Sequence, residues 1–141
     1  MMKQLMIWLS KLPAVSKING GVTVDYSGGA YAGLAIKAEP GHETLENYLN
    51  GNTLEKRDFR VEMYCSFSGD SMESVQNHEI LEELQLQMCN TLPPYLSQDK
   101  EIVKIKIADG GTSIKSAIGE GLLTFRFSVI YKRNGGDRVY D

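Results

Sequence analysis

The stretch DFRVEMYCSF, residues 58–67, alternates polar and apolar side chains without a break. This period of two predicts a β-strand that buries one face and turns the other toward solvent or a partner. The side chains expected to point inward are Phe59, Val61, Met63, Cys65 and Phe67, and those expected to point outward are Asp58, Arg60, Glu62, Tyr64 and Ser66. The pattern is interpreted as structural, and the stretch contains no recognisable catalytic apparatus.

An acidic helix is expected directly after this strand. Residues 68–71, SGDS, supply a turn and a candidate N-cap, and Glu73 is favourably placed near the positive end of the helix dipole. Apolar residues at helical spacing predict a core-facing stripe made of Ile80, Leu81, Leu84 and Met88. The helix is expected to end near Thr91, before the pair Pro93-Pro94.

The opposite side of this helix carries a second, weaker stripe. Val75 and Leu86 fall there, in line with Glu79 and Glu82. The stripe is a first indication of a subunit contact, although single apolar residues are also ordinary on a protein surface.

The flanking segments complete the predicted fold. They are a helix at 2–12, a hairpin of strands 22–26 and 31–38, a break at 39–41, a helical turn or two at 43–50, a strand at 103–107, a loop at 109–121 and a final strand at 123–131. This order predicts an α+β fold in one domain at residues 1–133, with a mixed, mostly antiparallel sheet and two helices packed on one face. Residues 134–141 are expected to form a polar C-terminal tail.

Composition limits the class of protein. The chain has 141 residues, of which 42% are hydrophobic and 23% charged, which is typical of one globular core. A net charge of −3 argues against broad electrostatic binding to nucleic acid. The apolar run at 5–9 is too short for the apolar region of a signal peptide, so the chain is expected to be cytoplasmic when it is made. Cys65 and Cys89 are expected to be buried free thiols rather than a disulfide or a metal site.

Motifs that suggest chemistry are incomplete. The run DGGTSIKS at 109–116 lacks the glycine before the lysine and the following helix of a phosphate-binding loop. HETLE at 42–46 lacks the second histidine of a zinc protease, so His42 is interpreted as a surface residue. His78 has no neighbouring nucleophile, and Glu82-Glu83 is interpreted as part of a solvated helix face. The sequence therefore predicts no catalytic residue, cofactor or metal.

Several short segments follow one another in a recognisable order: AIKAEP at 35–40, YLNG at 48–51, the strand at 59–67, the central helix, LP at 92–93 and FSVIYK at 127–132. This order resembles that of the minor capsid or tail-terminator proteins of tailed bacteriophages and related phage-tail-like particles. The likeness spans about residues 30–133 and leaves out the first helix and the polar tail.

This resemblance implies a structural virion-assembly protein and not an enzyme. Such a protein forms a ring, usually a hexamer, that caps the tail tube, stops its polymerisation and provides the surface for joining the head. The implied partners are further copies of the chain, the tail tube protein, a head-side connector protein and, in a contractile tail, the sheath. No membrane and no sequence-specific nucleic acid are implied, although DNA passes through such a ring. The implied location is the head-proximal end of the tail, after assembly in the host cytoplasm.

A ring needs two unlike complementary patches on each subunit. The residues predicted for subunit contacts are Val75, Glu79, Glu82, Leu86, Arg60, Glu62 and Tyr64. Edge strands are another candidate for pairing between neighbours, and Glu79 and Glu82 are alternatively expected to face a lumen through which DNA passes. The loop at 110–121 is predicted to contact the tube or the connector through Thr112, Ser113, Ile114 and Lys115.

Two other functions remain open from the sequence. One is a head-completion or connector protein of the same particle, which would bind the portal instead of the tube. The other is a small enzyme or ligand-binding domain that uses the glycine-rich loop and His78, which is disfavoured because these groups lack partners.

Overall fold

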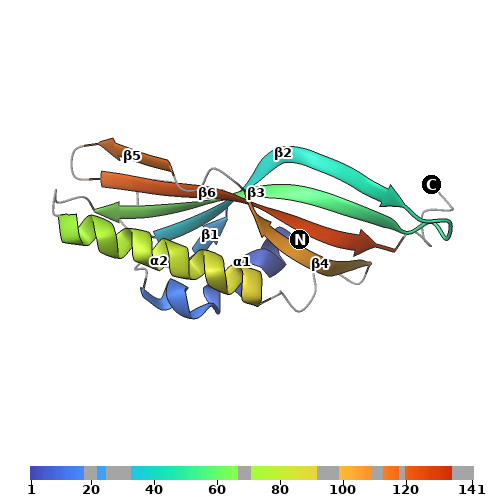
Figure 1. Cartoon of the computed structure of the whole chain (residues 1–141), viewed down its shortest axis with the longest axis horizontal. Helices are drawn as coiled ribbons and strands as arrows, with labels where there is room; N and C mark the ends of the chain where they lie inside the picture. Colours follow the sequence, from blue (N-terminus) through green and yellow to red (C-terminus); the bar gives the residue numbers. More distant parts are fainter. Residues whose placement is uncertain are drawn as a thin grey trace.

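A six-stranded sheet forms the body of the molecule in the computed structural model (Figure 1). The structure describes residues 1–17, 22–24, 33–66, 71–91, 99–108, 113–117 and 120–134. The strands are β1 (Val22–Val24), β2 (Gly33–Asn47), β3 (Thr53–Ser66), β4 (Lys100–Ile107), β5 (Ser113–Ala117) and β6 (Glu120–Arg133). Their order is β1-β2-β3-β6-β4, and β5 pairs with β6 off this path.

The central pair of strands, β3 and β6, forms an uninterrupted antiparallel ladder. Its register runs from Thr53 opposite Arg133 to Ser66 opposite Glu120 without a shift. The alternation predicted for residues 58–67 is confirmed where side chains are described, because Phe59, Val61 and Met63 are buried. The β6 side chains of the same core are Leu123, Phe125, Phe127, Val129 and Tyr131. The rings of Phe59 and Phe127 stack across the pair, with centroids 5.5 Å apart.

Two helices, α1 (Met2–Ser10) and α2 (Ser71–Asn90), cover one face of the sheet, together with the 3₁₀-helix η1 (Pro13–Lys17) (Figure 1). The predicted stripe on α2 is confirmed, since Leu81, Leu84 and Met88 are buried and Ile80 packs partly buried against them. The indole Nε1 of Trp8 donates to the carbonyl of Thr91 at 2.8 Å, which joins the two helices. The predicted α+β fold in a single domain is therefore confirmed.

The largest difference between the predicted and the observed fold lies in β2. A break at residues 39–41 and a helical turn after it were expected, but β2 continues through both to Asn47. The strand absorbs Pro40 and Gly41 in a register shift between Ala38 and His42, and it has a second shift between Thr44 and Glu46. β-Bulges of this kind, at the edge of a sheet, are where proline and glycine are tolerated in strands.

Three further predictions were wrong. Strand β1 runs parallel to β2, so the expected hairpin is not formed. Residues 113–117, expected to lie in a loop, form β5 and pair antiparallel with the start of β6. Cys89 is an exposed free thiol rather than a buried one, because it follows Met88 on the turn of α2 and faces away from the core. The side chains of Cys65 and Phe67 and the tail at 135–141 lie outside the described residues.

Candidate interaction surfaces

The face of the sheet opposite the helices carries a network of charged side chains. The guanidinium of Arg60 contacts Glu62, with Nη2 and Oε1 3.1 Å apart, and the Lys37 ammonium lies 3.0 Å from the same Glu62 oxygen. Glu62 is 5% exposed beneath these two cations. The predicted contact residues Arg60 and Glu62 thus lie on the outward face, but they are paired with each other inside the protomer. The side chain of Tyr64 lies outside the described part.

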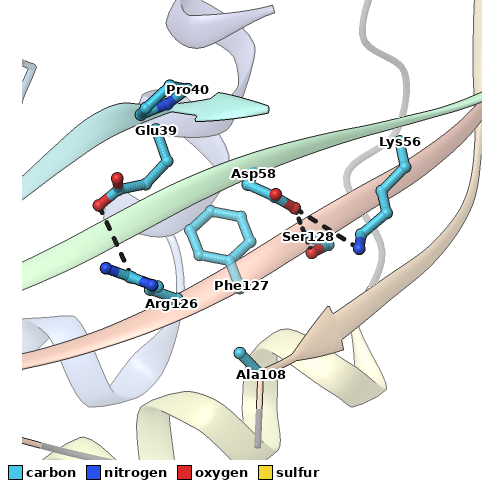
Figure 2. A pocket seen from close by; sticks show the side chains of 8 residues that line it. All are labelled: Glu39, Pro40, Lys56, Asp58, Ala108, Arg126, Phe127 and Ser128. Carbon is cyan, nitrogen blue, oxygen red and sulfur yellow. Dashed lines mark hydrogen bonds and ion pairs between the residues drawn. The ribbon is translucent and has the colours of Figure 1, made fainter. Parts of the chain in front are cut away.

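The same face contains a cleft of about 350 Å³ between β2, β3 and β6 (Figure 2). The residues that line it are Glu39, Pro40, Lys56, Asp58, Ala108, Arg126, Phe127 and Ser128. The Ser128 hydroxyl donates to Asp58 at 2.6 Å, and the Lys56 ammonium lies 4.0 Å from the same carboxylate oxygen. Arg126 lies 3.9 Å from Glu39 at the other end.

The charges of this cleft balance. Two carboxylates face two cations, so the cleft offers no excess charge to attract an ionic ligand. No histidine lines the cleft beside Ser128 and Asp58. The two residues therefore do not form the serine, histidine and acid arrangement that activates a serine nucleophile. The cleft is best described as a polar surface feature.

A buried polar cluster lies where β3 begins and β6 ends, on the face of the sheet that bears the helices. Glu55 is 2% exposed and accepts hydrogen bonds from the hydroxyl of Thr53 at 2.7 Å and from Nε2 of His42 at 2.5 Å. The Arg133 guanidinium lies 3.9 Å from Glu55 and 3.7 Å from Asp99. The Tyr131 hydroxyl is 3.4 Å from His42.

Glu55 is held ionised by this cluster. Burial by itself would raise the pKa of its carboxyl, but the hydrogen bonds from Thr53 and His42 and the charge of Arg133 outweigh that effect and lower the pKa. The cluster was not predicted from the sequence. A signal for it existed, because Thr53 and Glu55 continue the inward phase of Phe59 and Val61 along the same strand.

The outer side of α2 forms an exposed ridge. The side chains of Glu79 and Glu82 are exposed, and that of Leu86 is 63% exposed. The backbone of Val75 belongs to the same helix, although its side chain is not described. Of the predicted contact residues, Glu79, Glu82 and Leu86 therefore lie on this ridge, whereas Arg60 and Glu62 lie on β3.

The turn between β2 and β3 exposes the most accessible apolar side chain among the described residues. Leu49 is fully exposed, and its neighbour Tyr48 is 38% exposed. A backbone hydrogen bond of 3.0 Å from Gly51 to Tyr48 closes the turn. The Tyr48 hydroxyl donates to Glu46 at 2.9 Å, and this hydrogen bond raises the pKa of Tyr48. The sequence prediction of contact residues did not include this tip.

The predicted tube-contact segment is only partly described. Ser113, Ile114 and Lys115 lie on β5, opposite Thr124, Leu123 and Leu122 of β6. Their side chains, and Thr112 as a whole, lie outside the described residues. The segment is therefore the outer strand of a hairpin rather than a free loop.

Two other kinds of feature, membrane-spanning helices and metal sites, are not found among the described residues. No helix within the described ranges is long and apolar enough to cross a membrane. Among the residues that the structure places, no group of three or more His, Cys, Asp or Glu side chains is arranged to hold a metal ion.

No protein-family model matches the sequence, and no curated protein matches it significantly.

Proposed function

We propose that this protein is a tail terminator of a phage or phage-tail-like particle. In this role, six copies form a ring on the head-proximal end of the tail tube, stop its polymerisation and present the surface to which the head is joined. The proposal starts from the resemblance in segment order at residues 30–133. It treats the protein as structural, working through surfaces rather than through a catalytic centre.

The single observation that best supports the proposal is the asymmetry of the molecule. Strands β2 and β3 extend beyond the end of α2 and carry the turn with Tyr48 and Leu49 at their tip (Figure 1). A ring on a tube must contact its neighbours sideways and the tube lengthwise, so each subunit needs several unlike surfaces. The tip, the α2 ridge and the strand edges provide such unlike surfaces on one molecule.

We assign the lengthwise contact to the β2–β3 tip. A fully exposed leucine beside a tyrosine at the end of a long hairpin is well suited to enter an apolar recess of a stacked ring, since aromatic and apolar anchors dominate interface energies. The segment with Thr112, Ser113, Ile114 and Lys115 remains a second proposed contact with the tube or the head-side connector. Glu79, Glu82 and Leu86 remain proposed for contacts between subunits.

The proposal is tested by mixing the purified protein with tail tubes, followed by co-sedimentation and negative-stain imaging. Rings at one end of each tube, and shorter tubes when the protein is present during polymerisation, are expected. Binding to portal rings but not to tube ends would identify a head-completion protein instead. Binding to neither would contradict the proposed function.

Variants make this test specific to the tip. Leu49→Ser should lower co-sedimentation with tubes about tenfold or more without changing the melting temperature, because Leu49 has no core contact to lose. Ile7→Ser on α1 is a matched control, since Ile7 is also exposed but lies on the helix layer. Deletion of residues 111–118 with normal tail length and normal head joining would remove that segment from the proposed contacts.

A further inference from the structure

Two edges of the sheet are open in the described part of the chain. Strand β2 pairs with β1 only as far as Ile36, and beyond that residue its described partner is β3 alone. Strand β4 has β6 as its described partner on one side. Unpaired strand edges are natural places for another chain to dock. These two edges lie on opposite borders of the sheet, so one molecule offers both (Figure 1).

The two edges carry opposite charge on the same face. Glu43 and Glu46 stand opposite Lys56 and Leu54 of β3, and Lys104 and Lys106 stand opposite Ile130 and Ser128 of β6. Since Lys56 and Ser128 both line the cleft on the helix-free face, the alternation of the strands places all four charges on that face. The same face of β4 also carries Glu101, opposite Lys132 near the start of the strand, so that β4 has two lysines and one glutamate there. The edge of β2 is therefore acidic at Glu43 and Glu46, and the edge of β4 is basic at Lys104 and Lys106.

These charges differ from those of the neighbouring network. Arg60, Glu62 and Lys37 are paired within the protomer. Within the described ranges, Glu43, Lys104 and Lys106 form no ion pair and are exposed. They are available for charges on another molecule.

Each edge also exposes one aliphatic side chain at a bulge. Leu45 is 39% exposed and lies in the register shift between Thr44 and Glu46. Val103 is 44% exposed and lies in the shift between Ile102 and Lys104. Each edge thus has an exposed aliphatic residue directly before a charged one, which is Glu46 after Leu45 and Lys104 after Val103.

We propose that β4 of one protomer docks along the outer part of β2 of a second copy, with Lys104 and Lys106 facing Glu43 and Glu46, and with Val103 packing near Leu45. The inference rests on the proposed ring and names its lateral contact. Pro40 lacks an N–H and both bulges interrupt the ladder, so side-chain contacts carry more of this interface than backbone pairing.

The charge pattern favours unlike edges over like edges. A pairing of β4 with β4 would place lysines against lysines, and a pairing of β2 with β2 would place glutamates against glutamates, which is unfavourable at an interface. Contact between unlike edges is head to tail, and such contacts produce a closed ring when the rotation closes.

Charge reversal at each edge tests the proposal in the full-length chain. Lys104→Glu/Lys106→Glu makes both edges acidic, and Glu43→Lys/Glu46→Lys makes both edges basic. Native mass spectrometry should show at least about a tenfold loss of rings for each variant alone. An equal mixture of the two should regain rings in which the variants alternate, because each acidic edge then meets a basic one. Lys3→Glu/Lys11→Glu on and after α1, with both lysines exposed, is the matched control and should form rings as the wild type does.

The outcomes separate this contact from the proposed function. Rings formed by either variant alone, a mixture that yields only dimers or monomers, or a wild type that stays monomeric would overturn the contact. If a reversal variant has a lowered melting temperature, Lys104→Gln/Lys106→Gln replaces it, and unchanged ring occupancy in that neutral variant would also overturn the contact. Binding of the wild type to tube ends is scored separately. If the wild type forms rings but does not bind tube ends, the terminator role is refuted and the contact is kept. If the wild type binds tube ends while the charge-reversal variants still form rings alone, the contact is refuted and the terminator role is kept.

Discussion

Nε2 of His42 lies 2.5 Å from Oε1 of Glu55, although His42 is half exposed on β2 and Glu55 is almost fully buried on β3. This contact closes the polar cluster from the solvent side. An ionised carboxylate is tolerated in a protein interior when charge-assisted hydrogen bonds replace its water. The pair therefore lets the sheet extend past the apolar core without leaving a buried charge unsatisfied.

Glu55→Gln should lower the free energy of unfolding by about 2 kcal/mol at neutral pH, since a buried charged hydrogen bond is weakened while the shape is kept. The folded pKa of Glu55 lies below its ordinary value of 4.5, so its stabilisation is full above that value and is lost as the pH falls through the folded pKa. Urea denaturation at several pH values measures the difference between wild type and variant. The difference should shrink below pH 4.5. A constant gap down to acid pH would contradict the assignment, and Glu79→Gln, at an exposed position, is the control.

Gly41→Ala should destabilise the protein by about 1–3 kcal/mol for two separable reasons. Gly41 has a φ of +143°, which side-chain-bearing residues rarely adopt, and a Cβ there would lie 2.7 Å from Oδ2 of Asp58. Asp58 cannot move freely, because it accepts the hydrogen bond of Ser128.

A double-mutant cycle with Asp58→Ala separates the two effects of Gly41→Ala. Removing the carboxylate relieves the collision but not the backbone strain, so part of the loss should remain. Equal losses in both backgrounds would show that the collision contributes nothing. Thermal melts of the four proteins provide the measurement.

Phe127→Ala should cost about 3–5 kcal/mol, because Phe127 is fully buried in the stacked pair with Phe59 at the centre of the sheet. Phe127→Leu should cost less, since it leaves a smaller cavity. Leu86→Ala is the matched surface control and should stay within about 0.5 kcal/mol of the wild type. Chemical denaturation that ranks Phe127→Leu below Phe127→Ala in stability would contradict this account of the core.

Leu86→Asp should lower ring occupancy in native mass spectrometry if the α2 ridge contributes a subunit contact, because it would place a charge in an interface that excludes water. The melting temperature of the monomer should not change, since Leu86 is 63% exposed. An unchanged oligomer would remove Leu86 from the contact and leave the lateral interface to the strand edges.

The sequence predicted the regular parts of the fold well. The alternation at residues 58–67 and 123–131 identified β3 and β6, and helical spacing identified the buried stripe of α2, because single-face burial imposes these periods directly. The failures lie where tertiary context overrides local preference. Pro40 and Gly41 were interpreted as the end of a strand, yet an edge strand with a bulge accepts both. The direction of β1 is set by its place in the sheet, not by its own residues.

The interaction surfaces were less accessible to sequence reasoning. The α2 ridge followed from helical periodicity, whereas the exposure of Leu49 depends on how far β2 and β3 extend. The complementarity of Glu43 and Lys104 depends on strand order, because residues distant in sequence become opposite borders of one sheet only after folding.

The register of β3 against β6 has a consequence for the timing of synthesis. Residues 53–66 remain without their central neighbour until residues 120–133 have emerged from the ribosome. Contacts between such distant parts of a chain form late and slowly. Strand β4 also needs β6 as its neighbour, so the border proposed to meet another copy is complete only after residue 133 has emerged.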